Sequence, residues 1–153
     1  MIKVSVFSEE KAWSKRLKNT DTFFKKICRA FPKKYKFSNN KVSLSLLLSN
    51  NKNIKKLNKN FRNKNKSTDI LSFPFNKKIK LSKNMYLGDI IISYNYLNKP
   101  KFQNSELFKK KTIKIFIHGF LHLLGFNHIK NKDYLKMLRE ENFIYKHVKS
   151  KIN

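Results

Sequence analysis

Apolar and polar residues alternate in several segments of the chain, which predicts β-strands. In residues 2–7 and 42–49 every second side chain is apolar and most of the others are polar. Side chains of a strand point alternately to its two faces, so a period of two is typical of a strand with one buried face. Residues 68–75 and 86–93 are rich in isoleucine, leucine and phenylalanine, and they predict two further strands.

Four other segments have the features of helices. Ser8, which two glutamates follow, is the predicted N-cap of a helix that runs to about residue 31. Apolar residues three or four positions apart predict a second helix over about residues 52–63. Ser105 is the predicted cap of a helix that reaches Leu124, and a last helix is predicted over about residues 131–148. The order βαβαββαα predicts an α+β fold, with a mixed sheet of about four strands packed against helices.

The length and composition favour one domain over residues 1–153. A chain of this size buries roughly 68–70% of its unfolded surface, enough for a core without covalent links. Cys28 is the only cysteine, so no disulfide can form within the chain, and this suits a reducing cytosol. The most apolar window, residues 113–126, is interrupted by lysine and histidine and is shorter than the ~20 residues of a membrane span. We therefore expect a cytoplasmic protein without a membrane segment.

The net charge of +27 suggests a polyanionic partner such as nucleic acid. However, 32 of the 36 basic residues are lysine, only four are arginine, and asparagine occurs 19 times. Codon drift in an AT-rich genome would produce the same bias. Charge alone therefore leaves nucleic-acid binding open.

The sequence HGFLHLLGFNH, which begins at His118, has the spacing of a metal site. On a helix, the rings of His118 and His122 project from one side, about 6 Å apart along the axis. Gly125 can end this helix in the left-handed conformation and let the chain bring His128 back to the same place. Three neutral imidazoles leave a fourth position for water, as in catalytic rather than structural zinc sites. His147, near the end of the last helix, is expected to be solvent-exposed instead.

Three segments together resemble the YbeY family of single-domain, zinc-dependent endoribonucleases. HGFLHLLGFNH resembles the family's HGxLHLxGYDH, and LNKNFR at residues 57–62 resembles its LNxxYR. STDILSFPF and the following LGDIIIS resemble its PTDVLSFP and LGDIVIS. The resemblance covers residues 57–128 in the family's order, which is far more specific than any one motif.

This resemblance implies a zincin-like metal helix in the α+β fold and one Zn²⁺ per chain. It implies His118, His122 and His128 as the zinc ligands and Arg62 as the catalytic arginine. The implied activity is cleavage of single-stranded RNA in ribosomal RNA maturation, including the 3′ end of 16S rRNA, and in ribosome quality control. The implied partners are ribosomal RNA and the small ribosomal subunit.

The chemistry of the residues agrees with a phosphodiester substrate. A zinc protease of this spacing uses a glutamate directly after the first histidine to accept a proton from the metal-bound water, and this chain has Gly119 there. In phosphodiester cleavage negative charge develops on phosphoryl oxygens, so a nearby cation is the useful partner. Arg62 can hold a phosphate with two parallel hydrogen bonds.

Two departures from the family pattern concern the neighbours of these residues. Asn127 replaces the family's aspartate and cannot take up a proton, and Ser67 replaces a proline. Asp69 and Asp89 remain as candidate acids, although an aspartate that opens a strand is often a turn-former.

Two alternative functions are consistent with the same histidines. One is a non-enzymatic factor that binds the ribosome or RNA and has a zinc site, although structural zinc normally has four protein ligands. The other is a protease-like zincin with a displaced base. The site of cleavage, the general base and the oligomeric state are left open.

Overall fold

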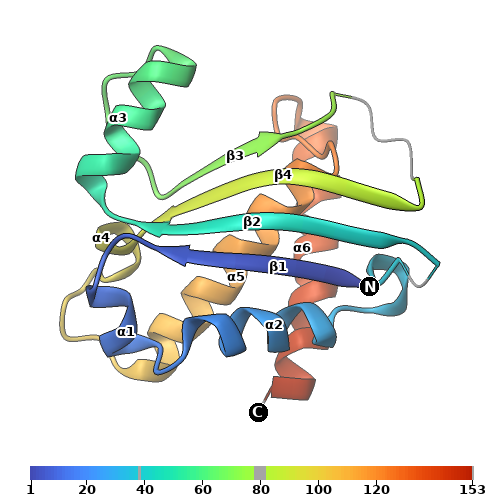
Figure 1. The fold of residues 1–153 in the computed structure, drawn as a ribbon, viewed down its shortest axis with the longest axis horizontal. Coiled ribbons are helices and arrows are strands. Elements are labelled where there is room, and N and C mark those ends of the chain that lie inside the picture. Colours follow the sequence, from blue (N-terminus) through green and yellow to red (C-terminus); the bar gives the residue numbers. More distant parts are fainter. Residues whose placement is uncertain (38, 78–81, 153) are drawn as a thin grey trace.

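A computed structural model of the protein describes residues 1–37, 39–77 and 82–152 (Figure 1). Its centre is a four-stranded sheet in the order β1-β2-β4-β3, formed by β1 (Ile2–Ser8), β2 (Lys41–Ser49), β4 (Asn84–Ser93) and β3 (Ile70–Pro74). β1, β2 and β4 are parallel, whereas β3 at one edge is antiparallel to β4. The predicted α+β fold with a mixed sheet is confirmed.

The helices lie mainly behind one face of this sheet (Figure 1). They are α1 (Ala12–Arg16), α2 (Thr20–Ala30), α3 (Asn51–Arg62), α4 (Tyr94–Leu97), α5 (Ser105–Leu123) and α6 (Asn131–Ile152), with a 3-10 turn η1 (Lys33–Tyr35). Figure 1 shows α5 and α6 behind the strands and α2 along the edge of the sheet next to β1, whereas α3 stands at one end of the sheet. Among the described residues, no helix combines the length and the apolar character needed to cross a membrane.

The first predicted helix is two helices, so the prediction that one helix runs from Ser8 to about residue 31 is wrong. Ser8 is the last residue of β1, and the chain leaves the helical conformation at Leu17 (φ −119°, ψ 103°). The Asn19 side chain then accepts a hydrogen bond from the Thr22 N–H at 2.9 Å and caps α2. Asparagine competes with helix continuation because its side chain binds the backbone locally.

The ends of four other elements also differ from the prediction. Asn104, not Ser105, caps α5 by accepting a hydrogen bond from the Leu107 N–H at 2.8 Å. The last helix continues four residues beyond the predicted end, to Ile152. β3 is shorter than predicted, and β4 begins two residues earlier. Each predicted strand is nevertheless present.

Large aromatic residues fill the space between the sheet and the helices behind it. Trp13, Phe24, Phe116 and Phe120 have no exposed surface. The rings of Phe24 and Phe116 meet edge to face with centroids 5.2 Å apart, an arrangement that adds to the free energy of burial. α5 is therefore fixed against the sheet along its middle, and its C-terminal end lies in a defined place relative to β3.

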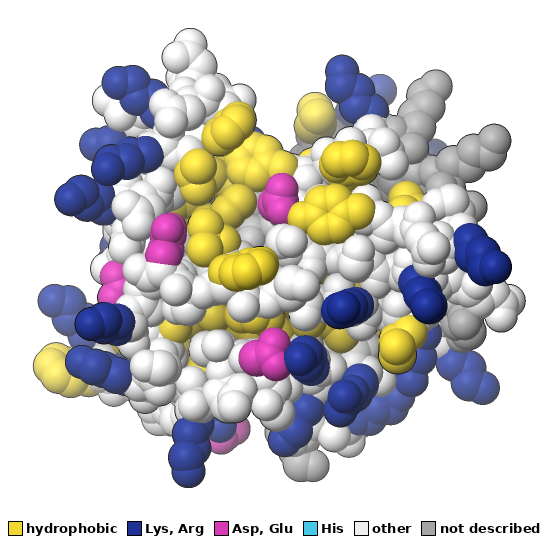
Figure 2. Space-filling model, in the orientation of Figure 1, with side chains coloured by type: hydrophobic (Ala, Val, Ile, Leu, Met, Phe, Trp, Pro, Cys, Tyr) yellow, Lys and Arg dark blue, Asp and Glu magenta, His cyan; other side chains and the backbone are white. Residues whose placement is uncertain are grey.

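The opposite face of the sheet is only partly covered. α3 packs there through Ile54, which is buried with Leu71 and Ile91. Beside α3 lies an open apolar groove, and the yellow side chains of Figure 2 mark this face. Its lining includes Phe7, Leu47, Leu57, Phe61, Phe73 and Asp89. Asp89 therefore lies on the face of the sheet opposite α5, the helix that carries His118 and His122.

Candidate metal and catalytic site

The histidine-bearing helix ends where the sequence predicts. Gly125 has φ +92°, a left-handed conformation that favours glycine. Its N–H donates to the His122 carbonyl at 3.0 Å, and the Phe126 N–H donates to the Leu121 carbonyl at 3.1 Å. These two bonds form a Schellman motif, which satisfies the last carbonyls of α5 and turns the chain back. His128 follows this turn.

The three histidines form one group. One nitrogen of each ring lies within 4.8 Å of the corresponding nitrogens of the other two. The Nε2 atoms of His118 and His122 are 3.0 Å apart. The centroid of the His128 ring lies 5.6 Å from the centroid of the His118 ring and 5.0 Å from that of the His122 ring. Ligands at 2.0–2.1 Å from a tetrahedral zinc would be about 3.3 Å apart, so the group fits a metal with little movement.

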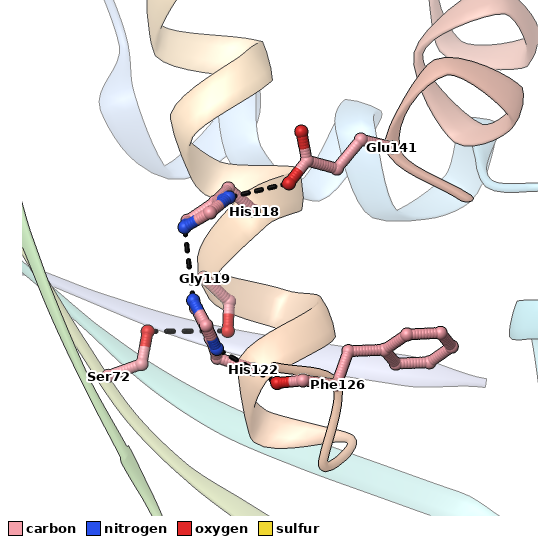
Figure 3. A network of polar contacts seen from close by, with 6 residues as sticks. All are labelled: Ser72, His118, Gly119, His122, Phe126 and Glu141. Atoms are coloured by element: carbon pink, nitrogen blue, oxygen red, sulfur yellow. Dashed lines mark hydrogen bonds and ion pairs between the residues drawn. The ribbon is translucent and has the colours of Figure 1, made fainter. Parts of the chain in front are cut away.

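In His118 and His122, hydrogen bonds determine which ring nitrogen carries the proton (Figure 3). His118 Nδ1 lies 2.5 Å from Glu141 Oε1, and His122 Nδ1 lies 2.9 Å from the Phe126 carbonyl oxygen. Ionised carboxylates and carbonyls only accept hydrogen bonds, so each Nδ1 must be the donor. In the neutral rings both Nε2 atoms then carry lone pairs, which point toward the same place and repel each other unless a cation lies between them.

The electrostatics of His122 favour the neutral form that a metal requires. Burial lowers the pKa of His122 below its usual 6.5, and the neighbouring His118 adds to this effect. Nitrogen ligands of this kind suit zinc and related transition metals, whereas Mg²⁺ and Ca²⁺ prefer oxygen. The donor set therefore fits zinc or a related transition metal.

Gly119 brings the metal helix close to the sheet. A Cβ atom at this position would lie 2.6 Å from Ile70 Cδ1 and 3.1 Å from Ser72 Oγ. The Ser72 hydroxyl also donates a hydrogen bond to the Gly119 carbonyl at 3.3 Å. Position 119 therefore faces β3 and β4, and a larger residue would require the side chains of Ile70 and its neighbours, or α5 itself, to move. This packing explains a glycine where a zinc protease has its glutamate.

Arg62 reaches the same pocket from another part of the chain. It is the last residue of α3, which Asn63 ends in the left-handed conformation (φ 54°). Arg62 Nη2 donates to the Ser72 carbonyl at 3.0 Å, and the guanidinium carbon lies 5.5 Å from the centre of the Phe73 ring. Arg62 and the three histidines line one cavity of about 570 Å³. The four predicted site residues are thus brought together.

The candidate acids are separated by the sheet. Asp69 lines the histidine pocket, whereas Asp89 lies in the groove on the opposite face and hydrogen-bonds to the Tyr86 hydroxyl at 2.5 Å. Asp69 Oδ1 accepts from the Ile70 N–H at 2.8 Å, so this residue also shapes the start of β3. The structure therefore leaves Asp69 as the candidate acid near the histidines and removes Asp89 from that role.

Asn127 acts on the loop that carries His128. It lines the pocket, and its Oδ1 accepts a hydrogen bond from the Ile129 N–H at 3.3 Å. An aspartate could accept the same bond, so this contact does not require a carboxylate at position 127. His147 lies outside the histidine group and is half-buried rather than fully exposed, because its ring packs against Phe143 with centroids 4.7 Å apart.

Two residues at the site were missed by sequence reasoning. Ser72 joins the two sides of the pocket, because its carbonyl accepts from Arg62 and its hydroxyl donates to the Gly119 carbonyl of α5. Glu141 comes from α6 and contacts His118 from 23 positions away. Glu141 is one of only nine acidic residues, which is the one signal that could have drawn attention to it.

Comparisons with known proteins agree with this site. A family model described as "Endoribonuclease YbeY" matches residues 6–149. The endoribonuclease YbeY of Pelagibacter ubique (strain HTCC1062) is 61% identical over 152 residues, which cover 99% of each chain. That of Ehrlichia canis (strain Jake) is 35% identical over 128 residues, 84% of this chain and 80% of the relative.

A solved structure agrees in fold. The solution structure of TM1509 from Thermotoga maritima matches with a TM-score of 0.56 and 24% identity, over 97% of this chain and 89% of the other. The family match and the identity to full-length relatives extend well beyond the three short motifs. They confirm the family that these motifs suggested: the chain belongs to the endoribonuclease YbeY family.

Proposed function

We propose that this protein is a zinc-dependent endoribonuclease that cleaves single-stranded RNA. We further propose that it acts in the cytoplasm on ribosomal RNA of the small ribosomal subunit, in processing of the 16S rRNA 3′ end and in ribosome quality control. Membership of an endoribonuclease family supports the activity. The particular RNA and the subunit are expectations from that family, in line with the large positive charge of +27.

One observation carries the proposal. The Nε2 atoms of His118 and His122 point at each other across 3.0 Å while acceptors hold both Nδ1 atoms, and Arg62 lines the same cavity. His118, His122 and His128 would hold the metal. Bound zinc would supply a Lewis acid and a water whose pKa is lowered to about 7.

The residues of the chain have separate tasks in this reaction. The guanidinium of Arg62 binds and orients the phosphate and stabilises the charge that develops on its oxygens. Its hydrogen bond to the Ser72 carbonyl uses one Nη2 donor, which leaves the other donors of the guanidinium available for a phosphate in the cavity that Arg62 lines. Asp69 is the acidic side chain in the lining and is therefore the candidate to accept a proton within the pocket.

The test is cleavage of RNA compared with cleavage of protein. Purified protein would be incubated with an RNA that has single-stranded and paired segments and, separately, with casein, each with and without a chelator. We expect RNA to be cut in single-stranded segments, casein to remain intact, the chelator to stop cleavage and added zinc to restore it. His118→Ala protein purified in parallel controls for contaminating ribonuclease, and His147→Ala is the matched histidine control.

Two other results of this experiment would support the alternative functions. RNA that is bound but not cut, with zinc present, would indicate a non-enzymatic RNA-binding factor. Cleavage of casein would indicate a protease-like zincin. Small subunits that carry unprocessed 16S rRNA would then test the proposed substrate, and equal cleavage of processed and unprocessed subunits would contradict a role in maturation.

A further inference from the structure

α6 reaches His118 of the candidate metal site through the side chain of Glu141. Its Oε1 lies 2.5 Å from His118 Nδ1, and the two side chains are 24% and 27% exposed. Figure 3 shows Glu141 reaching from α6 toward the side of the His118 ring that faces away from His122. Glu141 therefore contacts the histidine from behind, where it cannot compete for the metal position.

We propose that Glu141 is a positioning residue for the metal centre: it fixes the orientation and the tautomer of His118 so that Nε2 is free for the ion. This inference rests on the proposed function only in taking His118 as a metal ligand. A carboxylate accepts hydrogen bonds only, so the proton of the neutral His118 ring is held on Nδ1. Metal-bound histidines commonly have such a carboxylate behind them, which also raises the basicity of the ring.

Buried neighbours on α6 hold the backbone at Glu141. Met137 and Ile144, one turn to either side, are buried in the core. Glu141 thus projects from a backbone that is held on both sides, and the rotation of the His118 ring is restricted in turn. The adjacent Glu140 has partners other than His118: it accepts hydrogen bonds from the Lys34 ammonium at 3.0 Å and from the Tyr35 hydroxyl.

The hydrogen-bond partners of His122 and His118 differ in charge and in the element that supplies them. His122 Nδ1 donates to the Phe126 carbonyl, a neutral acceptor that belongs to the turn directly after α5. Glu141 is a charged acceptor, and it belongs to a different helix. A charged acceptor makes the stronger hydrogen bond. The C-terminal helix, which lies beyond the three matched motifs, therefore contributes a residue to the surroundings of the metal site.

Two measurements on Glu141 variants test this inference. The first is the affinity for zinc by competition with a chelator of known strength. Glu141→Ala should bind zinc ~10–100-fold more weakly, the range found when such outer partners are removed. Glu141→Gln keeps an acceptor of the same length and should recover part of this loss. Glu140→Gln is the matched control, because Glu140 is the next residue but contacts Lys34 and Tyr35, and it should bind zinc within about twofold of the parent.

The second measurement is the tautomer of His118 in metal-free protein, from the ¹⁵N resonances of the ring. The parent should have the proton on Nδ1, and Glu141→Ala should show a mixture of both tautomers, whereas Glu140→Gln should resemble the parent. Parental zinc affinity together with an unchanged His118 tautomer in Glu141→Ala would overturn the inference. A parent that binds no zinc would overturn the proposed function instead, while the tautomer would still decide the role of Glu141.

Discussion

The two sides of the candidate pocket are built in different ways. On the histidine side, His118 and His122 lie half-buried on α5, and a hydrogen-bond acceptor contacts the Nδ1 atom of each ring. Gly119 has no side chain, which allows the helix to lie close to the sheet. On the other side, Arg62 is an exposed side chain at the end of α3, held by one hydrogen bond to a carbonyl and by contact with the Phe73 ring.

This difference follows from what each side would bind. A metal ion requires a fixed geometry, so its ligands benefit from rigid elements and from outer hydrogen bonds that hold the rings. A phosphate arrives with a flexible RNA chain, and a long side chain with several donors can adjust to it. We therefore expect the histidine side to determine metal content and the arginine side to determine turnover, and the two should be separable by mutation.

Removal of the histidines should have the largest effect. We expect about one zinc per parental chain, consistent with a three-ligand catalytic site. His118→Ala, His122→Ala and His128→Ala should each lose most of the metal and the activity with it, whereas His147→Ala should keep both. Metal analysis of the purified variants measures this. Full metal content in the triple variant would show that the ion binds elsewhere.

Substitution of Arg62 should remove activity without removing metal. Arg62→Ala should keep its zinc and its fold but cleave RNA ~10²–10³-fold more slowly, the range for loss of a preorganised donor to a developing oxyanion. Arg62→Lys should recover little, because an ammonium cannot make the planar two-point contact. Single-turnover kinetics test this prediction. A parental rate in Arg62→Ala would show that the arginine has no role in turnover. It would contradict the prediction that the arginine side of the pocket determines turnover.

The lysine-rich surface outside the pocket should act through salt-dependent affinity. If it contacts RNA phosphates, the logarithm of the affinity should fall linearly with the logarithm of the salt concentration, by about 0.7 per contacted phosphate. About three contacts would give roughly a 10²-fold loss over a tenfold rise in salt. Fluorescence anisotropy with a short single-stranded RNA measures the slope. A flat response would mean that the charge of +27 reflects genomic bias.

The contacts of Glu140 with Lys34 and Tyr35 should have the smallest effect, on stability and in a defined pH range. Burial of Glu140 tends to raise its pKa, but hydrogen bonds from Tyr35 and Lys34 outweigh this and lower the pKa below its usual 4.5. Because the folded pKa is lowered, the contribution is present at neutral pH and disappears as the pH falls from 4.5 through the folded value.

Glu140→Gln should therefore lower the free energy of unfolding by about 1.5 kcal/mol at pH 7, at the low end for a hydrogen bond to a charged group. The difference from the parent should decrease as the pH falls from 4.5 through the folded pKa of Glu140, because the carboxyl then becomes neutral like the amide. Urea unfolding at pH 7 and over a series of acidic pH values measures it. A difference that does not change with pH would show that packing, not charge, is responsible.

Much of the fold could be predicted because its signals are local. Alternation in residues 2–7 and 42–49 predicts two strands, and both are present because one face of each is buried against the same core. The limits of the first helix could not be predicted, because Glu9 and Glu10 favour a helix start after Ser8 while the Asn19 cap favours a later one. The burial of Leu17, a tertiary contact, accompanies the break between the two helices.

The sequence by itself determined the ligand side of the site. The spacing of His118 and His122 places both rings on one side of any helix, and Gly125 allows the turn that returns His128, so these relations depend only on local backbone geometry. Only the tertiary structure decided the rest. It placed Arg62 and Asp69 in the histidine pocket, Asp89 on the opposite face of the sheet and Glu141 behind His118. Such contacts depend on how strands and helices pack, and residues distant in sequence carry no local signal of them.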